Sequence, residues 1–294
     1  MGDWPTIDSR QYIVAFELHS LSDCPPDFEL PGSFSDFDAG LFLPRDDPDW
    51  FGRSSYPPRI LLLKCGALHV ISHPSRGVPP CQYLLAQISS VESGHMLLKG
   101  WLRFAGTGLD STVRYNTRGF PAVSRFMRRF RDKLLNAAPC GTPEVDLRAS
   151  LDIKFANALE AELDPGETVL IQLFQPPRQI RSRNWLLPHR HWGAGDLLAL
   201  TGSRLLWITD RERGYRSSYG SIALYAPLDA VLRIGLKSGR PGHSLQVELT
   251  SGSGWQVPIA FGSPRECQQV ADNFAAALEM QKRRNEASRT EVRR

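Results

Sequence analysis

The 294-residue chain lacks any apolar run near the roughly 20 residues that a membrane-spanning helix requires, so we expect no transmembrane segment. Its first residues show no basic stretch followed by an apolar segment, and we therefore expect no secretory signal. Cysteine is scarce as well, since the five cysteines are widely spaced and form no CxxC pair. This usage predicts reduced, mostly buried thiols in a cytoplasmic protein and does not indicate a disulfide framework.

Motifs that carry catalysis or bind nucleotides are also missing. The sequence has no GxSxG nucleophile turn, no HExxH zinc pair, no GxxxxGK[ST] phosphate loop and no GxGxxG between a strand and a helix. His189 and His191 form an HxH pair without a third ligand at a defined spacing, and we interpret them as surface loop histidines. We therefore expect a non-enzymatic protein with no catalytic residue, no metal site and no cofactor.

Lysine is rare, and charge of either sign is nearly balanced. Six of the 35 basic residues are lysine, so the other 29 are arginine, and the formal net charge is only +4. So small an excess makes nucleic-acid binding an unfavoured interpretation, because that function usually needs a strongly basic surface. The 41% hydrophobic and 22% charged residues are typical of a soluble globular protein, and the length suffices for two domains.

One pattern of residues occurs twice in the chain. Thr201–Gly214 echoes Cys65–Gly77, and Tyr225–Val231 echoes Leu85–Val91. Each copy then passes through a turn and further apolar strand patterns into one amphipathic helix. The repetition predicts a duplicated small β-domain. The predicted division is a first domain at 1–136, a linker at 137–150, a second domain at 151–282 and a charged tail at 283–294.

Alternating apolar residues and turn residues predict seven strands in each copy, closed by one helix. In the first copy the strands are expected near Tyr12–Leu18, Arg59–Lys64, Leu68–Ser72, Gln82–Ala86, Val91–Leu98, Trp101–Ala105 and Thr112–Asn116. In the second they are expected near Thr168–Phe174, Asp196–Thr201, Arg204–Thr209, Tyr215–Leu224, Ala230–Lys237, Ser244–Thr250 and Trp255–Phe261. The predicted helices are Pro121–Asn136, Leu151–Leu163 and Pro264–Gln281. We predict long loops over Ser20–Pro58 and Gln175–Gly195.

The predicted order of short strands and one closing helix matches a known arrangement. Leu198–Asp210 contains a turn, an Arg and an apolar strand ending in Thr-Asp, and Ala226–Val231 contains a Pro-Leu strand start. These stretches resemble the pleckstrin-homology superfold, in particular the bacterial PH-like domains. The resemblance covers most of 165–282 and, more loosely, 10–136, where Leu68 stands in place of the Arg. It implies a mainly β fold of two tandem PH-like bent seven-stranded sheets, each capped by a C-terminal helix.

The two long loops carry opposite charge. Between Leu21 and Trp50 there are eight acids and one base, whereas the second loop has no acid before Asp196. The candidate anion-binding residues of the second loop are Arg178, Arg181, Arg183, His189 and Arg190. Guanidinium groups pair phosphate in a bidentate manner. In eukaryotic PH domains the loop after the first strand holds phosphoinositide headgroups, and the Arg-Ser-Arg at 181–183 is similar to the (K/R)-x-R core of that pattern, without its leading Lys.

Three functions are compatible with these patterns. The leading hypothesis is a cytoplasmic, non-enzymatic binding or scaffold protein with an unknown protein partner. The first alternative is peripheral association with an anionic membrane or a phosphate group through the Arg178–Arg190 loop. The second alternative is an enzyme whose site lies in a groove between the two domains. The acidic and basic loops have a purely structural alternative too, in which they pair with each other.

Overall fold

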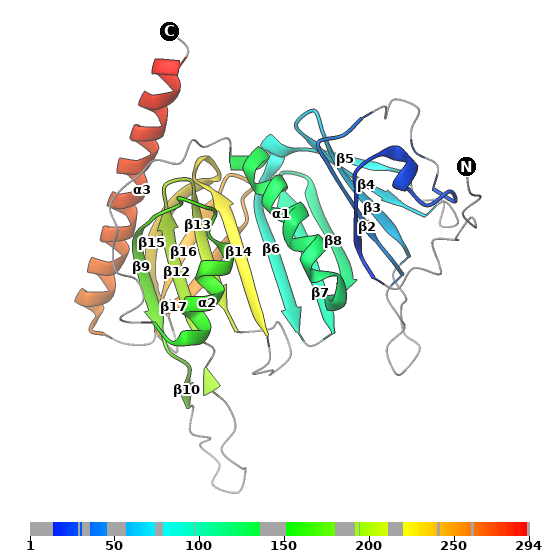
Figure 1. Cartoon of the computed structure of the whole chain (residues 1–294). Coiled ribbons are helices and arrows are strands. Elements are labelled where there is room, and N and C mark those ends of the chain that lie inside the picture. The colour runs from blue at the N-terminus through cyan, green and yellow to red at the C-terminus, as the bar shows by residue number, and fades with distance from the viewer. Residues whose placement is uncertain are drawn as a thin grey trace, which may run out of the picture. The chain divides into compact units, whose positions relative to one another are not determined.

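The chain is mainly β, with several antiparallel sheets and a long C-terminal helix (Figure 1). The computed structural model describes residues 14–28, 30, 36–45, 57–73, 79–96, 98–135, 151–179, 192–193, 195–210, 220–239, 242–259 and 262–292. Two compact units divide the chain. Unit 1 comprises 1–88, 95–103 and 109–136, and unit 2 comprises 89–94, 104–108 and 137–294. The middle of β6 (Ile88–Met96) and the last three residues of β7 (Lys99–Gly106) thus belong to unit 2.

The first half of the chain begins with five antiparallel strands that neighbour one another in chain order. They are β1 (Phe16–Leu18), β2 (Ala39–Leu43), β3 (Arg59–Lys64), β4 (Ala67–Ser72) and β5 (Cys81–Leu84). Short 3-10 turns are η2 (Leu21–Asp23), η4 (Leu85–Gln87) and η5 (Thr117–Gly119). After η4 come β6, β7 and β8 (Leu109–Asn116), again neighbours in chain order, and α1 (Phe120–Leu135) follows η5.

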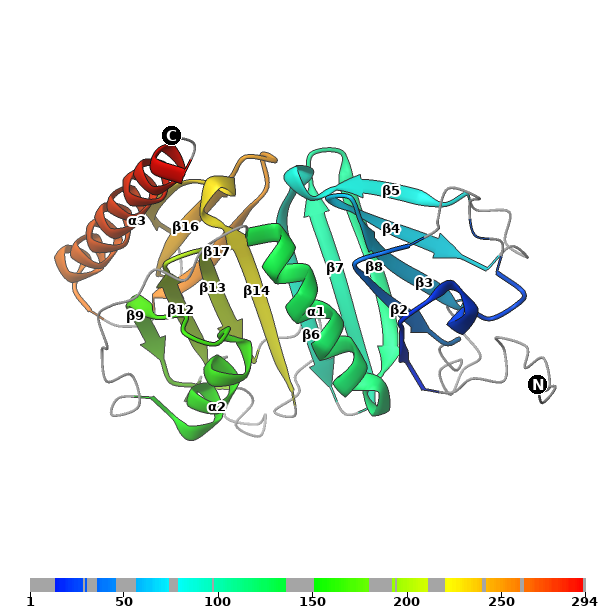
Figure 2. The ribbon, with the colours of Figure 1, turned by 45° about the horizontal axis from the view of Figure 1, so that its top comes forward.

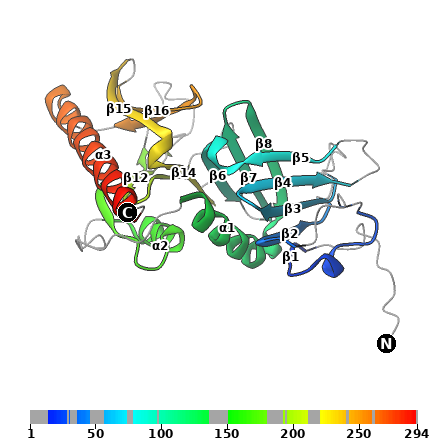
Figure 3. The ribbon, with the colours of Figure 1, turned by 90° about the horizontal axis from the view of Figure 1, so that it is seen from above.

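The core of unit 1 is built on β3 and α1. Residues Ile60 to Leu63 of β3 are 0% exposed, so this strand is buried on both faces. The β3–β4 turn consists of Cys65 and Gly66 with φ of 49° and 72°, the left-handed pair that a tight antiparallel hairpin requires. Helix α1 lies along β1 and β2 (Figure 3) and buries Phe126 and Phe130, as its apolar spacing predicts.

The second half of the chain also combines short antiparallel strands with helices. Its elements are α2 (Ile153–Glu162), β9 (Val169–Gln175), β12 (Asp196–Thr201), β13 (Arg204–Thr209), β14 (Ser221–Pro227), η7 (Leu228–Ala230), β15 (Val231–Ser238), β16 (His243–Leu249), β17 (Gly254–Ile259) and α3 (Pro264–Val292). Strands β9, β12, β13 and β14 neighbour one another in that order, and β15, β16 and β17 form a three-stranded antiparallel sheet. Helix α3 lies along that sheet (Figure 2).

Sequence patterns located most of these elements. The strands predicted at Asp196–Thr201 and Arg204–Thr209 are confirmed to the residue, because both consist of apolar residues bounded by turn residues. In α3, Phe274 and Leu278 are 1% exposed, as predicted, whereas Val270 is only half-buried.

Three predictions about loops and ends are wrong. The predicted loop Gln175–Gly195 contains two short paired strands, β10 (Arg178–Gln179) and β11 (Trp192–Gly193). The segment Ser20–Pro58 contains β2, whose five residues are all buried and therefore show no polar alternation for a sequence pattern to detect. Helix α3 does not end at Gln281 but continues to Val292, so the charged tail predicted from residue 283 is helical for most of its length. These last turns carry no apolar stripe, and contacts to other residues of unit 2 hold them in place.

Polar contacts to residues distant in the sequence hold the C-terminal turns of α3. The amide nitrogens of Gln281 and Asn285 both donate to the carbonyl of Gly202, at 3.1 and 3.2 Å. The Lys282 ammonium donates to the carbonyl of Val231 at 2.5 Å. Among the described residues, no helix is both long enough and apolar enough to cross a membrane.

Candidate functional site

The basic loop predicted to bind anions is only partly described. Arg178 lies in the two-residue strand β10 (Arg178–Gln179), which pairs with β11 (Trp192–Gly193) in an antiparallel register. The other candidates, Arg181, Arg183, His189 and Arg190, lie outside the described residues.

Four acids of the opposite loop have partners inside unit 1. Asp23 accepts hydrogen bonds from the backbone nitrogens of His19 and Ser20, at 2.7 and 2.8 Å, and these bonds keep the pKa of Asp23 below its usual value. Asp27 lies 2.9 Å from Nε2 of His73. Asp36 forms an ion pair with Lys64 at 3.0 Å, and Asp38 forms one with Lys133 at 3.0 Å. Glu29, Asp46, Asp47 and Asp49 lie outside the described residues.

His69 lies in β4 and His73 directly follows that strand, and both have contacts that stabilise the fold. His73 lies edge-on to the Phe28 ring at 5.5 Å as well as against Asp27. Burial and the nearby Lys64 lower the pKa of His69, which favours its neutral form. Across the described parts of the chain, no group of three or more His, Cys, Asp or Glu side chains is arranged to hold a metal ion.

The cysteines differ from the prediction in their burial. The four that lie among the described residues are free thiols, as expected, but only Cys267 is buried and Cys65 is exposed at the tip of the β3–β4 turn. Burial raises the pKa of Cys24 to about 11, so this thiol is not a nucleophile near neutral pH.

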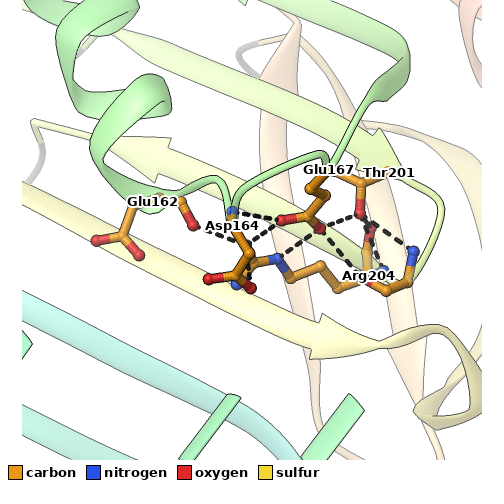
Figure 4. A network of polar contacts seen from close by, with 6 residues as sticks. Glu162, Asp164, Glu167, Thr201 and Arg204 are labelled. Atoms are coloured by element: carbon orange, nitrogen blue, oxygen red, sulfur yellow. Dashed lines mark hydrogen bonds and ion pairs between the residues drawn. The ribbon is translucent and has the colours of Figure 1, made fainter. Parts of the chain in front are cut away.

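A network of polar contacts in unit 2 surrounds Arg204, whose side chain is 0% exposed (Figure 4). Arg204 is the first residue of β13, and its guanidinium reaches the turn between α2 and β9. Nε donates to Oε1 of Glu167 at 3.0 Å, and Nη2 contacts Oε2 of the same carboxylate. Nη2 also donates to the carbonyl of Glu162 at 2.7 Å and lies 3.4 Å from Oδ2 of Asp164. One buried cation therefore holds both the C-terminal end of α2 and the following turn.

The Glu167 carboxylate is further satisfied by the β12–β13 turn. The hydroxyls of Thr201 and Ser203 donate to Oε1 at 2.7 and 2.9 Å, and the backbone nitrogen of Asp164 donates to Oε2 at 3.0 Å. Burial alone raises the pKa of Glu167, but the Arg204 charge and these hydrogen bonds outweigh it, so the pKa lies below its usual value.

The chemistry available to this cluster is structural. Glu167 stays ionised near neutral pH and its lone pairs are occupied by donors, so it cannot act as a general acid or accept a proton readily. The guanidinium carbon of Arg204 lies 5.4 Å from the centroid of the Tyr225 ring, which adds a cation–π contact. The place of Arg204 in a fold motif could be predicted from the sequence, but its contacts with Glu162, Asp164 and Glu167 could not. The one available signal was an Arg at the start of an otherwise apolar strand.

Comparison with protein-family models gives no match, and comparison with curated proteins finds none with significant similarity.

Proposed function

We propose that the two halves are copies of one PH-like domain and that the protein is a non-enzymatic binding or scaffold module. The observation that carries the proposal is the matching strand register of the two halves. In the first, Arg59 pairs with Ser72 and Lys64 with Ala67; in the second, Asp196 pairs with Thr209 and Leu200 with Leu205. Both hairpins thus join six-residue strands through a two-residue turn.

The neighbouring strands support the same correspondence. Strand β2 pairs Leu43 with Arg59, and β9 pairs Gln175 with Asp196, so each hairpin is preceded by a strand in the same register. A 3-10 turn follows β5 in the first half and β14 in the second. Its first residue donates to the hairpin turn each time: Leu85 to the Gly66 carbonyl at 2.9 Å, and Leu228 to the Ser203 carbonyl at 3.2 Å.

These registers refine the alignment of the repeat. Arg204 corresponds to Ala67 instead of Leu68, and Leu228 corresponds to Leu85 instead of Ile88. Four strands, a 3-10 turn, three strands and a helix then occur in both halves. The first half adds β1, η2 and η5, and the second adds α2 and the β10–β11 pair. This is the element order that the resemblance to PH-like domains implies. The Ala at position 67 also means that the Arg204 ion pair belongs to the second copy alone.

Binding is favoured over catalysis by the chemistry of the described polar groups. The buried carboxylate and guanidinium of unit 2 neutralise each other, and the acids of the unit 1 loop that are described have partners close by. Groups used in this way stabilise a scaffold and are not poised for proton transfer.

Partner capture with the full chain tests the leading proposal. We expect chemical cross-linking in an extract, followed by mass spectrometry, to identify a partner that rebinds the purified protein at micromolar concentration. A turnover activity that a point substitution abolishes without unfolding the protein would refute the non-enzymatic assignment.

The second candidate function is anionic membrane or phosphate binding through the Arg178–Arg190 loop. The sequence between β10 and β11 favours it, because it contains Arg181, Arg183, His189 and Arg190 and no acid. The double substitution Arg181→Glu/Arg183→Glu should abolish affinity for polyanions without changing the melting temperature. A lower melting temperature, with no affinity in the parent protein, would instead indicate a structural loop paired with acids.

A further inference from the structure

Two large apolar side chains are exposed at one end of unit 1. Leu98, in the turn between β6 and β7, is 60% exposed, and Phe120, the first residue of α1, is 39% exposed. Tight turns usually carry Gly, Asn, Asp or Ser. The β15–β16 turn of unit 2 follows that rule with Ser238, Gly239 and Gly242. An apolar β6–β7 turn therefore has no explanation in turn geometry.

The exposed pair belongs to an ordered surface. The backbone nitrogen of Thr117 donates to the carbonyl of Leu98 at 3.0 Å, which ties the β6–β7 turn to η5. The Asn116 side chain accepts from the backbone nitrogen of Arg118 at 3.0 Å, and the Phe120 ring lies 5.5 Å from the His95 ring. The backbone at Leu98 and the ring of Phe120 thus have defined contacts within unit 1.

Cations flank this pair. Lys99 and Arg118 are both exposed, and for the described residues no ion pair of the Arg118 guanidinium is found. Next to them is a shallow hollow of about 310 Å³, lined by His19, Arg118 and Arg125 among others. Glu17 also lines the hollow and contacts Arg125. Counting Lys99, Arg118, Arg125 and Glu17 leaves a local excess of two positive charges at neutral pH.

We propose that this surface, which we call the unit 1 tip (Leu98, Lys99, Arg118 and Phe120), binds an anionic lipid bilayer. Leu98 and Phe120 would enter the boundary between headgroups and acyl chains, while Lys99 and Arg118 contact lipid phosphates. The adjoining hollow accepts a headgroup phosphate through Arg118. This site is separate from the Arg178–Arg190 loop, and it does not depend on the identity of any protein partner.

The pattern of charge selects a bilayer over a protein partner. The tip is a turn with apolar residues bordered by charges of one sign, which complements the negative surface of an anionic membrane. Two apolar side chains cover far less area than a stable protein interface needs. An association of this size is expected to be weak, reversible and sensitive to salt.

Vesicle flotation of the full-length protein tests the proposal. Phosphatidylcholine vesicles with and without phosphatidylserine are compared for the wild type, Leu98→Asn/Phe120→Ser, Lys99→Glu/Arg118→Glu and the control Ile153→Ser. Ile153 is 77% exposed on α2, so its substitution removes a similar apolar surface from another place. We expect wild-type binding only to vesicles with phosphatidylserine, and a loss of about tenfold or more in partition coefficient for both tip variants. The control should bind like the wild type.

Several outcomes would overturn the proposal. The proposal fails if the wild type does not bind, or if it binds equally to vesicles without phosphatidylserine. It also fails if Leu98→Asn/Phe120→Ser keeps its binding, or if Ile153→Ser loses as much binding as the tip variants. Competition by soluble glycerophosphoserine would assign the hollow to a free phosphate ester instead of a bilayer. Unchanged melting temperatures of the tip variants establish that they fold. If Arg181→Glu/Arg183→Glu lost flotation while the tip variants kept it, membrane binding would belong to the Arg178–Arg190 loop. Protein partners found by cross-linking test the proposed function separately, and neither flotation result changes them.

Discussion

At the scale of single residues, Arg204 anchors the turn between α2 and β9 to the start of β13. Its guanidinium is fully buried, and its carboxylate partner Glu167 is nearly so. Replacing one member of such a pair leaves the other charge buried without compensation. We expect Arg204→Met to lower the free energy of unfolding by about 3–5 kcal/mol in urea denaturation followed by tryptophan fluorescence.

A matched control distinguishes burial from ion pairing as such. Arg233 and Glu248 form a bidentate pair at 2.7 Å on the exposed face of β15 and β16. Solvent screens this pair, so Arg233→Met should leave the denaturation midpoint nearly unchanged. Similar losses for both substitutions would contradict the role assigned to burial. The double variant Arg204→Met/Glu167→Leu should recover part of the stability lost by the single substitution, because no buried charge remains.

The same pair predicts a pH dependence. Because the pKa of Glu167 is lowered in the folded state, its stabilising effect is fully present above the ordinary Glu pKa of about 4.3. The effect is lost as pH falls from that value through the lowered pKa, since the folded carboxylate then takes up a proton. Glu167→Gln should therefore melt below the wild type at pH 7, and the gap should narrow below about pH 4.3. A gap that stays constant into acid would refute the assignment.

At the scale of elements, α3 combines two kinds of attachment. Its first half buries Cys267, Ala271, Phe274 and Leu278, whereas its last turns depend on side-chain hydrogen bonds. Phe274→Ala should cost about 3–5 kcal/mol of unfolding free energy, the usual effect of truncating a core Phe. Val270→Ala, at a half-buried position, should cost clearly less. A Phe274→Ala loss below about 1 kcal/mol in chemical denaturation would mean that α3 does not close the core.

The C-terminal turns of α3 allow a separate prediction. Asn285 donates to the Gly202 carbonyl in a partly buried position, and Arg289 pairs with Asp229 at 2.8 Å on the surface. We expect Asn285→Ala to lower stability by about 1 kcal/mol and Arg289→Ala to have almost no effect. Thermal unfolding followed by circular dichroism compares the two. The reverse order would mean that the surface ion pair holds these turns.

At the scale of the whole molecule, the proposed duplication predicts similar local stability in both units. Ile60–Leu63 of β3 and Leu197–Leu200 of β12 are all 0% exposed and occupy equivalent places in their hairpins. Their amides should exchange most slowly in hydrogen–deuterium exchange measured by mass spectrometry, because such central strands open only with global unfolding. Protection of β12 without comparable protection of β3 would argue against two equivalent domains.

Much of this architecture could be predicted from sequence where local signals are strong. The hairpins at 59–72 and 196–209 consist of apolar strands around a turn, and the apolar stripes of α1 and α3 repeat at helical spacing. Strand β2 escaped detection because it is short and wholly buried, so it shows no alternation. The helical end of α3 escaped because its contacts are hydrogen bonds to Gly202 and Val231, residues distant in the sequence.

The sequence by itself determined the mainly β class, the strand and helix pattern and the absence of common catalytic motifs, since these follow from periodicity and residue type within short windows. Only the tertiary structure decided which charges are neutralised. Arg204 and Glu167 lie on separate elements, as do Asp38 and Lys133, and chain folding alone brings them within bonding distance. The same holds for the unit 1 tip, where a backbone hydrogen bond joins Leu98 to Thr117 across β7 and β8. Pairing between distant residues depends on long-range packing, and no local pattern encodes it.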